Sequence, residues 1–208
     1  IAATDIENMV KFAKDNAIDL VMVAPDDPLV LGMVDAMEKE GIRAFGPRAN
    51  AAIIEGSKAF SKELMKKYNI PTANYEVFTD STSAIDYIKA QNTFPTVIKA
   101  DGLALGKGVI IAQNLEEAEQ AVHEMIDDGK FGKSGSRVVI EEFLTGPEVS
   151  VLAFTDGKTV KPMVSAQDHK RAYDNDEGLN TGGMGTFSPS RVYTKELAEE
   201  CMKTIYQP

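Results

Sequence analysis

The sequence has few of the residues that several common functional sites require. Its 208 residues include one cysteine, Cys201, and two histidines, His123 and His169. A single cysteine excludes an intramolecular disulfide and fits a reducing compartment, so we expect a cytoplasmic protein. Two histidines exclude a histidine-rich metal site. No Ser-His-Asp triad, zinc cluster or catalytic cysteine–histidine pair is recognisable. No run is long and apolar enough to span a membrane, and no signal peptide is visible.

Positive charge is also scarce. Lysine and arginine together number 22 against 32 aspartates and glutamates, which gives a net charge of −10. Such a surface repels nucleic acid and anionic membranes, so neither is an expected partner. Any anionic substrate must be bound by a local basic site. The apolar fraction of 43% is that of an ordinary globular protein with a sizeable core.

The first part of the chain alternates helical and strand-like segments. Apolar residues at helical spacing predict helices over 4–16 and 25–41, the second ending at Gly41. Short apolar runs predict strands over 18–24 and 42–45. The α-β-α-β order indicates a parallel sheet of Rossmann-like type, of which only the last units are present.

The middle of the chain predicts a small α+β lobe. Its expected strands cover 75–78, 96–100, 109–112 and 137–142, with helices over 83–90 and 115–128. The 83–90 helix is expected to be capped by serine or threonine. A preceding helix over 57–69 has an apolar stripe and a lysine stripe, and we expect the lysines to lie on a solvated face. The apolar stripe is Phe60, Leu64 and Tyr68, and the lysine stripe is Lys58, Lys62 and Lys66.

The last part predicts an antiparallel hairpin, formed by "PEVSVLAF" and "TVKPMVSAQ" with a "TDGK" turn between them. No regular period is visible from 168 to 189, and "CMKTIYQP" is expected to be helical. Because the chain opens at Ile1 and stops within this helix, we expect a fragment of a longer protein.

The segment "VIKADGLALGKGVIIA" places Lys99 in one strand and Lys107 in a glycine loop that leads to the next strand. Glycines let backbone N–H groups approach an anion closely, and a lysine beside them adds charge, so the segment suits phosphate. The spacing is not that of a P-loop. The alternatives are a flexible hairpin with a solvated Lys107 and a Lys99 that extends along an edge strand into solvent.

Two later segments also carry polar groups suited to binding. In "EEFLTGPEVS", the carboxylates of Glu141, Glu142 and Glu148 are suited to accept hydrogen bonds from a ribose or an adenine amino group. In the irregular region, "DHKR" and "NTGGMG" combine charge with glycines in a segment that is costly to order unless it binds something. The alternative for the glutamates is simple exposure to solvent. The alternative for the irregular region is a flexible surface loop.

Five blocks together resemble a known family. They are "EGSKAFSKELMKKYNIPTA", "VIKADGLALGKGVIIA", "VIEEFLTGPEVS", "QDHKR" and "NTGGMGTFSP". In this order, and over essentially all 208 residues, they are similar to the phosphoribosylamine–glycine ligases (glycinamide ribonucleotide synthetases) of the ATP-grasp superfamily. The resemblance implies the end of a Rossmann-like domain over 1–48 and an incomplete ATP-grasp central lobe over 49–71 and 144–208. The small lid lobe of the fold would be 72–143.

The resemblance also implies site residues. Lys58 and Lys99 would contact the ATP phosphates under a loop carrying Gly102, Gly106, Lys107 and Gly108. Glu141 and the backbone at Phe143 and Leu144 would hold adenine, and Glu148 would hold the ribose. The catalytic residues would be Lys99, Lys107 and Arg171. Those lining the phosphoribosylamine and glycine site would be Asp168, His169, Lys170, Arg171, Asn180, Thr181, Gly182, Gly183, Met184 and Gly185.

The resemblance further implies Mg²⁺ or Mn²⁺, with ligands expected beyond Pro208 and none in this chain. Where the family tends to have Gly-Pro-Glu, this chain has Ala24, Pro25 and Asp26. The implied reaction joins glycine to 5-phosphoribosylamine through a glycyl phosphate, giving glycinamide ribonucleotide, ADP and phosphate in purine biosynthesis. The protein would be a monomer or weak homo-oligomer, and this piece alone would be inactive. The alternatives are another ATP-grasp carboxylate-amine ligase, which should lack "NTGGMG", and a nucleotide-binding fragment without activity.

Overall fold

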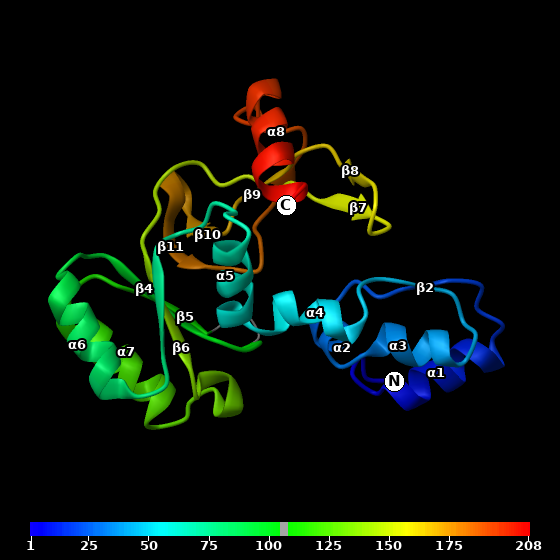
Figure 1. Ribbon diagram of the computed structural model, residues 1–208, viewed down its shortest axis with the longest axis horizontal. Helices are drawn as coiled ribbons and strands as arrows, with labels where there is room; N and C mark the ends of the chain where they lie inside the picture. Colours follow the sequence, from blue (N-terminus) through cyan, green and yellow to red (C-terminus); the bar gives the residue numbers. More distant parts are fainter. Residues whose placement is uncertain (105–107) are drawn as a thin grey trace. The chain divides into compact units, whose positions relative to one another are not determined.

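The computed structural model describes residues 1–104 and 108–208 (Figure 1). The chain forms two compact units. One consists of Ile1–Leu64 and Ala73–Phe143, and the other of Met65–Thr72 and Leu144–Pro208. The described residues include no helix that combines the length and the apolar character needed to cross a membrane.

The N-terminal part is an α/β arrangement, as the sequence predicts. Helix α1 (Ile6–Asp15) begins where the Asp5 carboxylate accepts a hydrogen bond from the amide of Asn8. Strands β1 (Val21–Met22) and β2 (Ala44–Phe45) pair in parallel. The core of this part of the chain consists of Ala13, Val23, Met33, Val34 and Met37.

Two features of this part differ from the sequence prediction. The helix expected over 25–41 is two helices, α2 (Asp26–Val30) and α3 (Met33–Lys39), because Gly32 between them has a left-handed φ of 89°. Glycine adopts this conformation without steric cost, so it can end one helix and begin another. Helix α4 (Ala49–Gly56) was not predicted at all.

The middle of the chain forms a four-stranded antiparallel sheet with the order β3-β6-β4-β5. The strands are β3 (Tyr75–Phe78), β4 (Thr96–Ala100), β5 (Val109–Ala112) and β6 (Val138–Glu142). These bounds confirm the expected strands, and β4 and β5 form the expected hairpin. In the central pair, Lys99 lies opposite Val139 and Val97 opposite Glu141.

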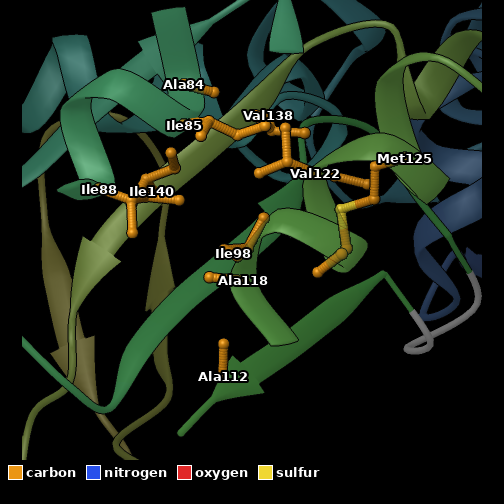
Figure 2. Close-up of a cluster of buried hydrophobic side chains, with 12 residues drawn as sticks. Ala84, Ile85, Ile88, Ile98, Ala112, Ala118, Val122, Met125, Val138 and Ile140 are labelled. Atoms are coloured by element: carbon orange, nitrogen blue, oxygen red, sulfur yellow. The ribbon is translucent and has the colours of Figure 1, made fainter. Parts of the chain in front are cut away.

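Helices α6 (Ser81–Gln91) and α7 (Leu115–Ile126) cover one face of this sheet (Figure 1). Figure 2 shows their apolar side chains gathered with those of the strands into a continuous core, in which Ile98 and Val122 are fully buried. The helix over 83–90 is confirmed, but its cap is the Asp80 carboxylate, which accepts from the amide of Ser83 at 2.8 Å, and not serine or threonine.

Helix α5 (Lys58–Lys67) contradicts the expected orientation of its two stripes. Lys62 is only 6% exposed, whereas Phe60 and Tyr68 of the apolar stripe are 40% and 45% exposed. The reason is that the four-stranded sheet supplies a carboxylate partner for Lys62, so the charged side chain is buried without being left unpaired. The spacing of residues along the helix sequence does not reveal such a partner, because the partner lies on another element.

The second unit contains short antiparallel pairs. Strands β7 (Ala153–Thr155) and β8 (Val160–Pro162) form the expected hairpin. The region from 168 to 189, expected to lack regular structure, contains further pairs between β9 (Gln167–Asp168) and β12 (Thr186–Phe187) and between β10 (Arg171–Tyr173) and β11 (Glu177–Asn180). Helix α8 (Lys195–Cys201) continues as a π-helical turn over Met202–Tyr206.

Candidate functional site

The face of the four-stranded sheet opposite α6 and α7 carries charge. Side chains alternate between the two faces of a strand. Ile98 and Ala100 point to the face covered by α6 and α7, so Lys99 and Asp101 in the β4 segment point to the opposite face. Arg137 and Glu141 do the same at the two ends of the β6 segment. Together with two side chains of α5, these groups form what we call the charged face, consisting of Lys58, Lys62, Lys99, Asp101, Arg137 and Glu141.

The centre of the charged face is the Glu141 carboxylate, which is only 6% exposed. One of its oxygens, Oε2, accepts from Lys99 Nζ at 2.9 Å and from Lys62 Nζ at 3.0 Å. The sequence singled out Lys99 and Glu141 as site residues, and the structure brings them into contact. It adds Lys62, which the lysine spacing on α5 alone assigned to solvent.

Lys58 lies at the same face, at the first turn of α5. Its Nζ donates to the carbonyl oxygen of Gly102 at 3.0 Å. Burial lowers the pKa of Lys58, and the positive charge of Lys99 lowers it further, while the Asp101 carboxylate acts in the opposite direction. A bound anion would compensate this ammonium group for its lost hydration and would offset its repulsion from Lys99.

A carboxylate that the sequence did not single out holds this arrangement together. Asp101 accepts from Ser57 Oγ at 3.0 Å, from the amide of Ala59 at 2.7 Å and from Arg137 Nε at 3.0 Å. Its carbonyl oxygen also accepts from the amide of Lys58 at 2.9 Å. Asp101 therefore joins the end of β4 to the start of α5. The only sequence signal was its place as the first residue of the glycine loop, and Arg137 had none.

The described glycines of this loop are needed for space. A Cβ on Gly102 would lie 2.5 Å from Ser134 Oγ, and one on Gly108 would lie 2.6 Å from the Cβ of Ala104. Both distances are shorter than real side chains adopt, so neither position tolerates a larger residue without a shift of its neighbours. Gly106 and Lys107, which the sequence also assigned to this site, lie outside the described residues.

The segment after β6 holds the remaining residues expected to bind adenine and ribose. Phe143 and Leu144 are 37% and 64% exposed. The carboxylate of Glu148 is also largely exposed and forms an ion pair with Lys170. This ion pair links two residues that the sequence assigned to different ligands.

In the second unit, the pairing of β9 with β12 brings "DHKR" and "NTGGMG" together. The amide of His169 donates to the carbonyl oxygen of Gly185 at 3.0 Å, and the amide of Met184 donates to the carbonyl oxygen of His169 at 2.7 Å. Thr181 Oγ1 donates to the carbonyl oxygen of Lys170 at 2.9 Å. The two segments, which the sequence treated as a joint site, are thus neighbours.

Two side chains in these segments have contrasting surroundings. Arg171 Nη1 donates to the carbonyl oxygen of Gly178 at 2.7 Å, which fixes the guanidinium against β11. Within residues 1–104 and 108–208, Asp168 Oδ1 is a buried side-chain oxygen without a hydrogen-bond donor. A Cβ on Gly183 would lie 2.8 Å from this oxygen, so the glycine is needed beside it. A buried acceptor without a donor is suited to take a hydrogen bond from a ligand.

No group of three or more histidine, cysteine, aspartate or glutamate side chains in the described parts of the chain is arranged to hold a metal ion. The side chains of the charged face do not make a metal site either, because its cations outnumber its two carboxylates. We therefore assign no step of the chemistry to a metal held by these residues.

Two family models match the chain. Residues 1–55 match the N domain of phosphoribosylglycinamide synthetase, and residues 56–208 match its ATP-grasp (A) domain. This chain belongs to the phosphoribosylglycinamide synthetase family. The resemblance inferred from the sequence blocks is confirmed, and so is a mixed α/β fold with an ATP-grasp domain.

Individual relatives agree with this assignment. This chain is 53% identical over 208 residues to a phosphoribosylamine–glycine ligase of Haemophilus influenzae and 52% identical to that of Pasteurella multocida. Each match covers 100% of this chain and 48% of the relative. The chain thus spans about half the length of the curated relatives it matches.

Solved structures extend the comparison to the fold. A phosphoribosylamine–glycine ligase from Thermotoga maritima is 39% identical, with a TM-score of 0.68 over 78% of this chain and 42% of that one. The biotin carboxylase domain of a Hydrogenobacter thermophilus 2-oxoglutarate carboxylase has a TM-score of 0.74 at 21% identity, over 97% of this chain and 44% of that one. The second likeness shows the fold alone.

Proposed function

We propose that this synthetase-family chain carries the ATP site and part of the acceptor site of a ligase that joins glycine to 5-phosphoribosylamine. The products would be glycinamide ribonucleotide, ADP and phosphate, formed through a glycyl phosphate in purine biosynthesis. The names of its relatives and the arrangement of "DHKR" beside "NTGGMG" support this choice over another carboxylate-amine ligase. A cytoplasmic monomer or weak homo-oligomer fits this function.

The observation that carries the proposal is the excess of positive charge on the charged face. Its four cations outnumber its carboxylates, Asp101 and Glu141, by two, in a chain whose net charge is −10. Local positive charge in an acidic protein attracts anions to one place. The ATP phosphates are the anions that an ATP-grasp domain would bind there.

The remaining site residues would act as follows. Lys58 and Lys99 would neutralise the phosphates, and Lys107 would add charge from the glycine loop. Glu141 and the backbone at Phe143 and Leu144 would hold adenine, and Glu148 would hold the ribose. The acceptor site would be built from Asp168, His169, Lys170 and Arg171 together with the loop from 180 to 185. Mg²⁺ or Mn²⁺ would be held by ligands beyond Pro208.

The expected chemistry makes demands that these groups meet. Transfer of a phosphoryl group to a carboxylate needs fixed positive charge where negative charge develops. Lys99 is fixed by Glu141, and Lys58 by Gly102, so neither must be ordered when the nucleotide arrives. We propose the boundaries given above for the domains, with 1–48 as the Rossmann-like part and 72–143 as the small lobe.

The test is Lys99→Met in the intact protein. Loss of a charge-assisted contact costs about 1.5–3 kcal/mol, so the Kd for ATP should rise about 10- to 100-fold in titration calorimetry. Lys89→Met is the matched control, since Lys89 lies on α6 in an exposed ion pair with Glu119. Unchanged ATP binding in the Lys99 variant would overturn the assignment of the phosphate site. Turnover that does not depend on glycine would overturn the assignment of the substrate.

A further inference from the structure

We propose that Lys62 is a positioning residue, which acts through Glu141 to keep the charge of Lys99 available to the ATP phosphates. The inference rests on the proposed function. Lys62 follows Lys58 by one turn of α5, and its side chain is only 8% exposed. The side chain of Lys99 is 28% exposed. The two lysines therefore contact the same carboxylate oxygen, but the side chain of Lys99 is more accessible to a ligand than that of Lys62.

The partners of Lys62 show that its ammonium group serves the protein interior. Nζ contacts Glu141 Oε2 at 3.0 Å and donates to the carbonyl oxygen of Ala73 at 3.3 Å. It also lies 5.4 Å from the centroid of the Tyr75 ring, in the geometry of a cation–π contact. All three of these partners belong to the protein. Lys62 is placed to act on Glu141 and not on a nucleotide.

The charge balance gives Lys62 its role. A single carboxylate between two ammonium groups leaves one positive charge in excess. If Lys62 were neutral, Glu141 would be compensated by Lys99 alone, and the pair would present no net charge to an anion. A half-buried pair with no competing partner also holds its members more tightly. Lys99 would then have to break that pair to reach a phosphate.

The same geometry sets the direction of Lys99. With Oε2 shared between two donors at 2.9 and 3.0 Å, the carboxylate is held in one orientation from the α5 side. Glu141 therefore orients the ammonium group of Lys99, while Lys62 compensates the charge of the carboxylate, so that the positive charge of Lys99 is not neutralised. This arrangement explains why a helix would bury a lysine while it leaves Phe60 40% exposed on another side.

The test is a double-mutant cycle in the intact protein between Lys62→Met and Glu141→Gln, read out as the Kd for ATP by titration calorimetry. We expect Lys62→Met to weaken ATP binding about tenfold or more, the scale of losing one charge-assisted contact. In the Glu141→Gln background, the same change should alter the Kd less than about twofold, because the carboxylate through which Lys62 acts is gone. The KM for glycine should change little in every variant.

Two outcomes would overturn the inference. A folded Lys62→Met protein that binds ATP as the unaltered protein does would remove any role for Lys62. An equal loss of affinity in both backgrounds would show that Lys62 does not act through Glu141. If Lys62→Met alone does not fold, Lys62→Gln, which keeps a hydrogen-bond donor beside Glu141 but removes the charge, takes its place in the cycle with the same expected outcomes.

Controls separate this inference from the proposed function. Lys66→Met removes an exposed charge from the same helix and should leave the Kd for ATP unchanged. If Lys99→Met weakens ATP binding but Lys62→Met does not, only the role of Lys62 fails. If Lys99→Met has no effect, the phosphate site itself is wrongly assigned.

Discussion

The two faces of the four-stranded sheet have opposite chemistry, although their residues alternate along the same strands. On one face, Ile98 and Ile140 pack against α6 and α7 in a core without charge (Figure 2). On the other, Lys99 and Glu141 form an ion pair under α5. The apolar face stabilises the lobe. Because side chains alternate along each strand, the same stable strands hold the charged groups rigidly on the opposite face. The following predictions separate these two contributions.

The largest effect should come from the apolar face. Ile98 is fully buried, so Ile98→Ala removes apolar contacts and leaves a cavity, which typically lowers the free energy of unfolding by about 2–5 kcal/mol. Denaturant unfolding measures this change. Val109→Ala is the matched control, because Val109 lies on the neighbouring strand and is 42% exposed. Similar losses at the two positions would show that the core does not depend on this face.

A smaller effect is expected from the charged face. Arg137→Met leaves the Asp101 carboxylate, whose side chain is 13% exposed, without its guanidinium partner. Because Arg137 itself is 42% exposed, water can partly replace it, and we expect a loss of about 1–3 kcal/mol in the free energy of unfolding. In Asp101→Asn the loss from Arg137→Met should be smaller, since no charge is left uncompensated. Equal losses in both backgrounds would show that the pair contributes nothing specific.

The smallest effect concerns pH. Burial and the charge of Lys99 lower the pKa of Lys58 in the folded protein from the ordinary 10.5. For a lysine this shift disfavours the folded state while the group is protonated in both states, and the penalty disappears as the pH rises through the folded pKa towards 10.5. The affinity for ATP should therefore begin to fall at a pH below 10.5, because the neutral amine no longer neutralises phosphate.

Lys58→Arg tests this pH dependence, because a guanidinium group stays protonated over the whole range. In this variant the alkaline loss of ATP affinity should shift to higher pH, as measured by calorimetric titration across the alkaline range. The same exchange at Lys66 should leave the profile unchanged. A profile that is identical in Lys58→Arg and the unaltered protein would show that Lys58 does not carry the titration.

The comparison of the two faces also shows what could be predicted from sequence. The elements of the apolar face were predictable, because the strands over 96–100 and 137–142 and the helix over 115–128 have local signals in the sequence. On the charged face, the motifs single out Lys99 and Glu141 as candidate site residues, and the structure brings the two into contact. The burial of Lys62 could not be predicted, because it depends on a carboxylate that lies 79 positions further along the chain.

Local signals failed elsewhere for similar reasons. Gly32 was read as an ordinary helical residue, although it breaks the expected helix by adopting a positive φ. Asp101 is given no role by the sequence, in which it is only the first residue of the glycine loop, although its carboxylate is fixed by donors from α5 and from Arg137. In each case the deciding feature is a tertiary contact or a backbone conformation, and neither produces a recognisable pattern in the local sequence.

The hydrogen bond between Arg137 and Ser57 has a consequence for how the site comes into being. These residues are 80 positions apart, whereas the β4–β5 hairpin closes within a few residues of chain. Contacts of long sequence separation form late, because the loop between them must first be closed. During synthesis, Ser57 and Lys58 leave the ribosome long before Arg137 exists. The hairpin can therefore fold first, and the charged face is assembled only after β6 has been added to the sheet.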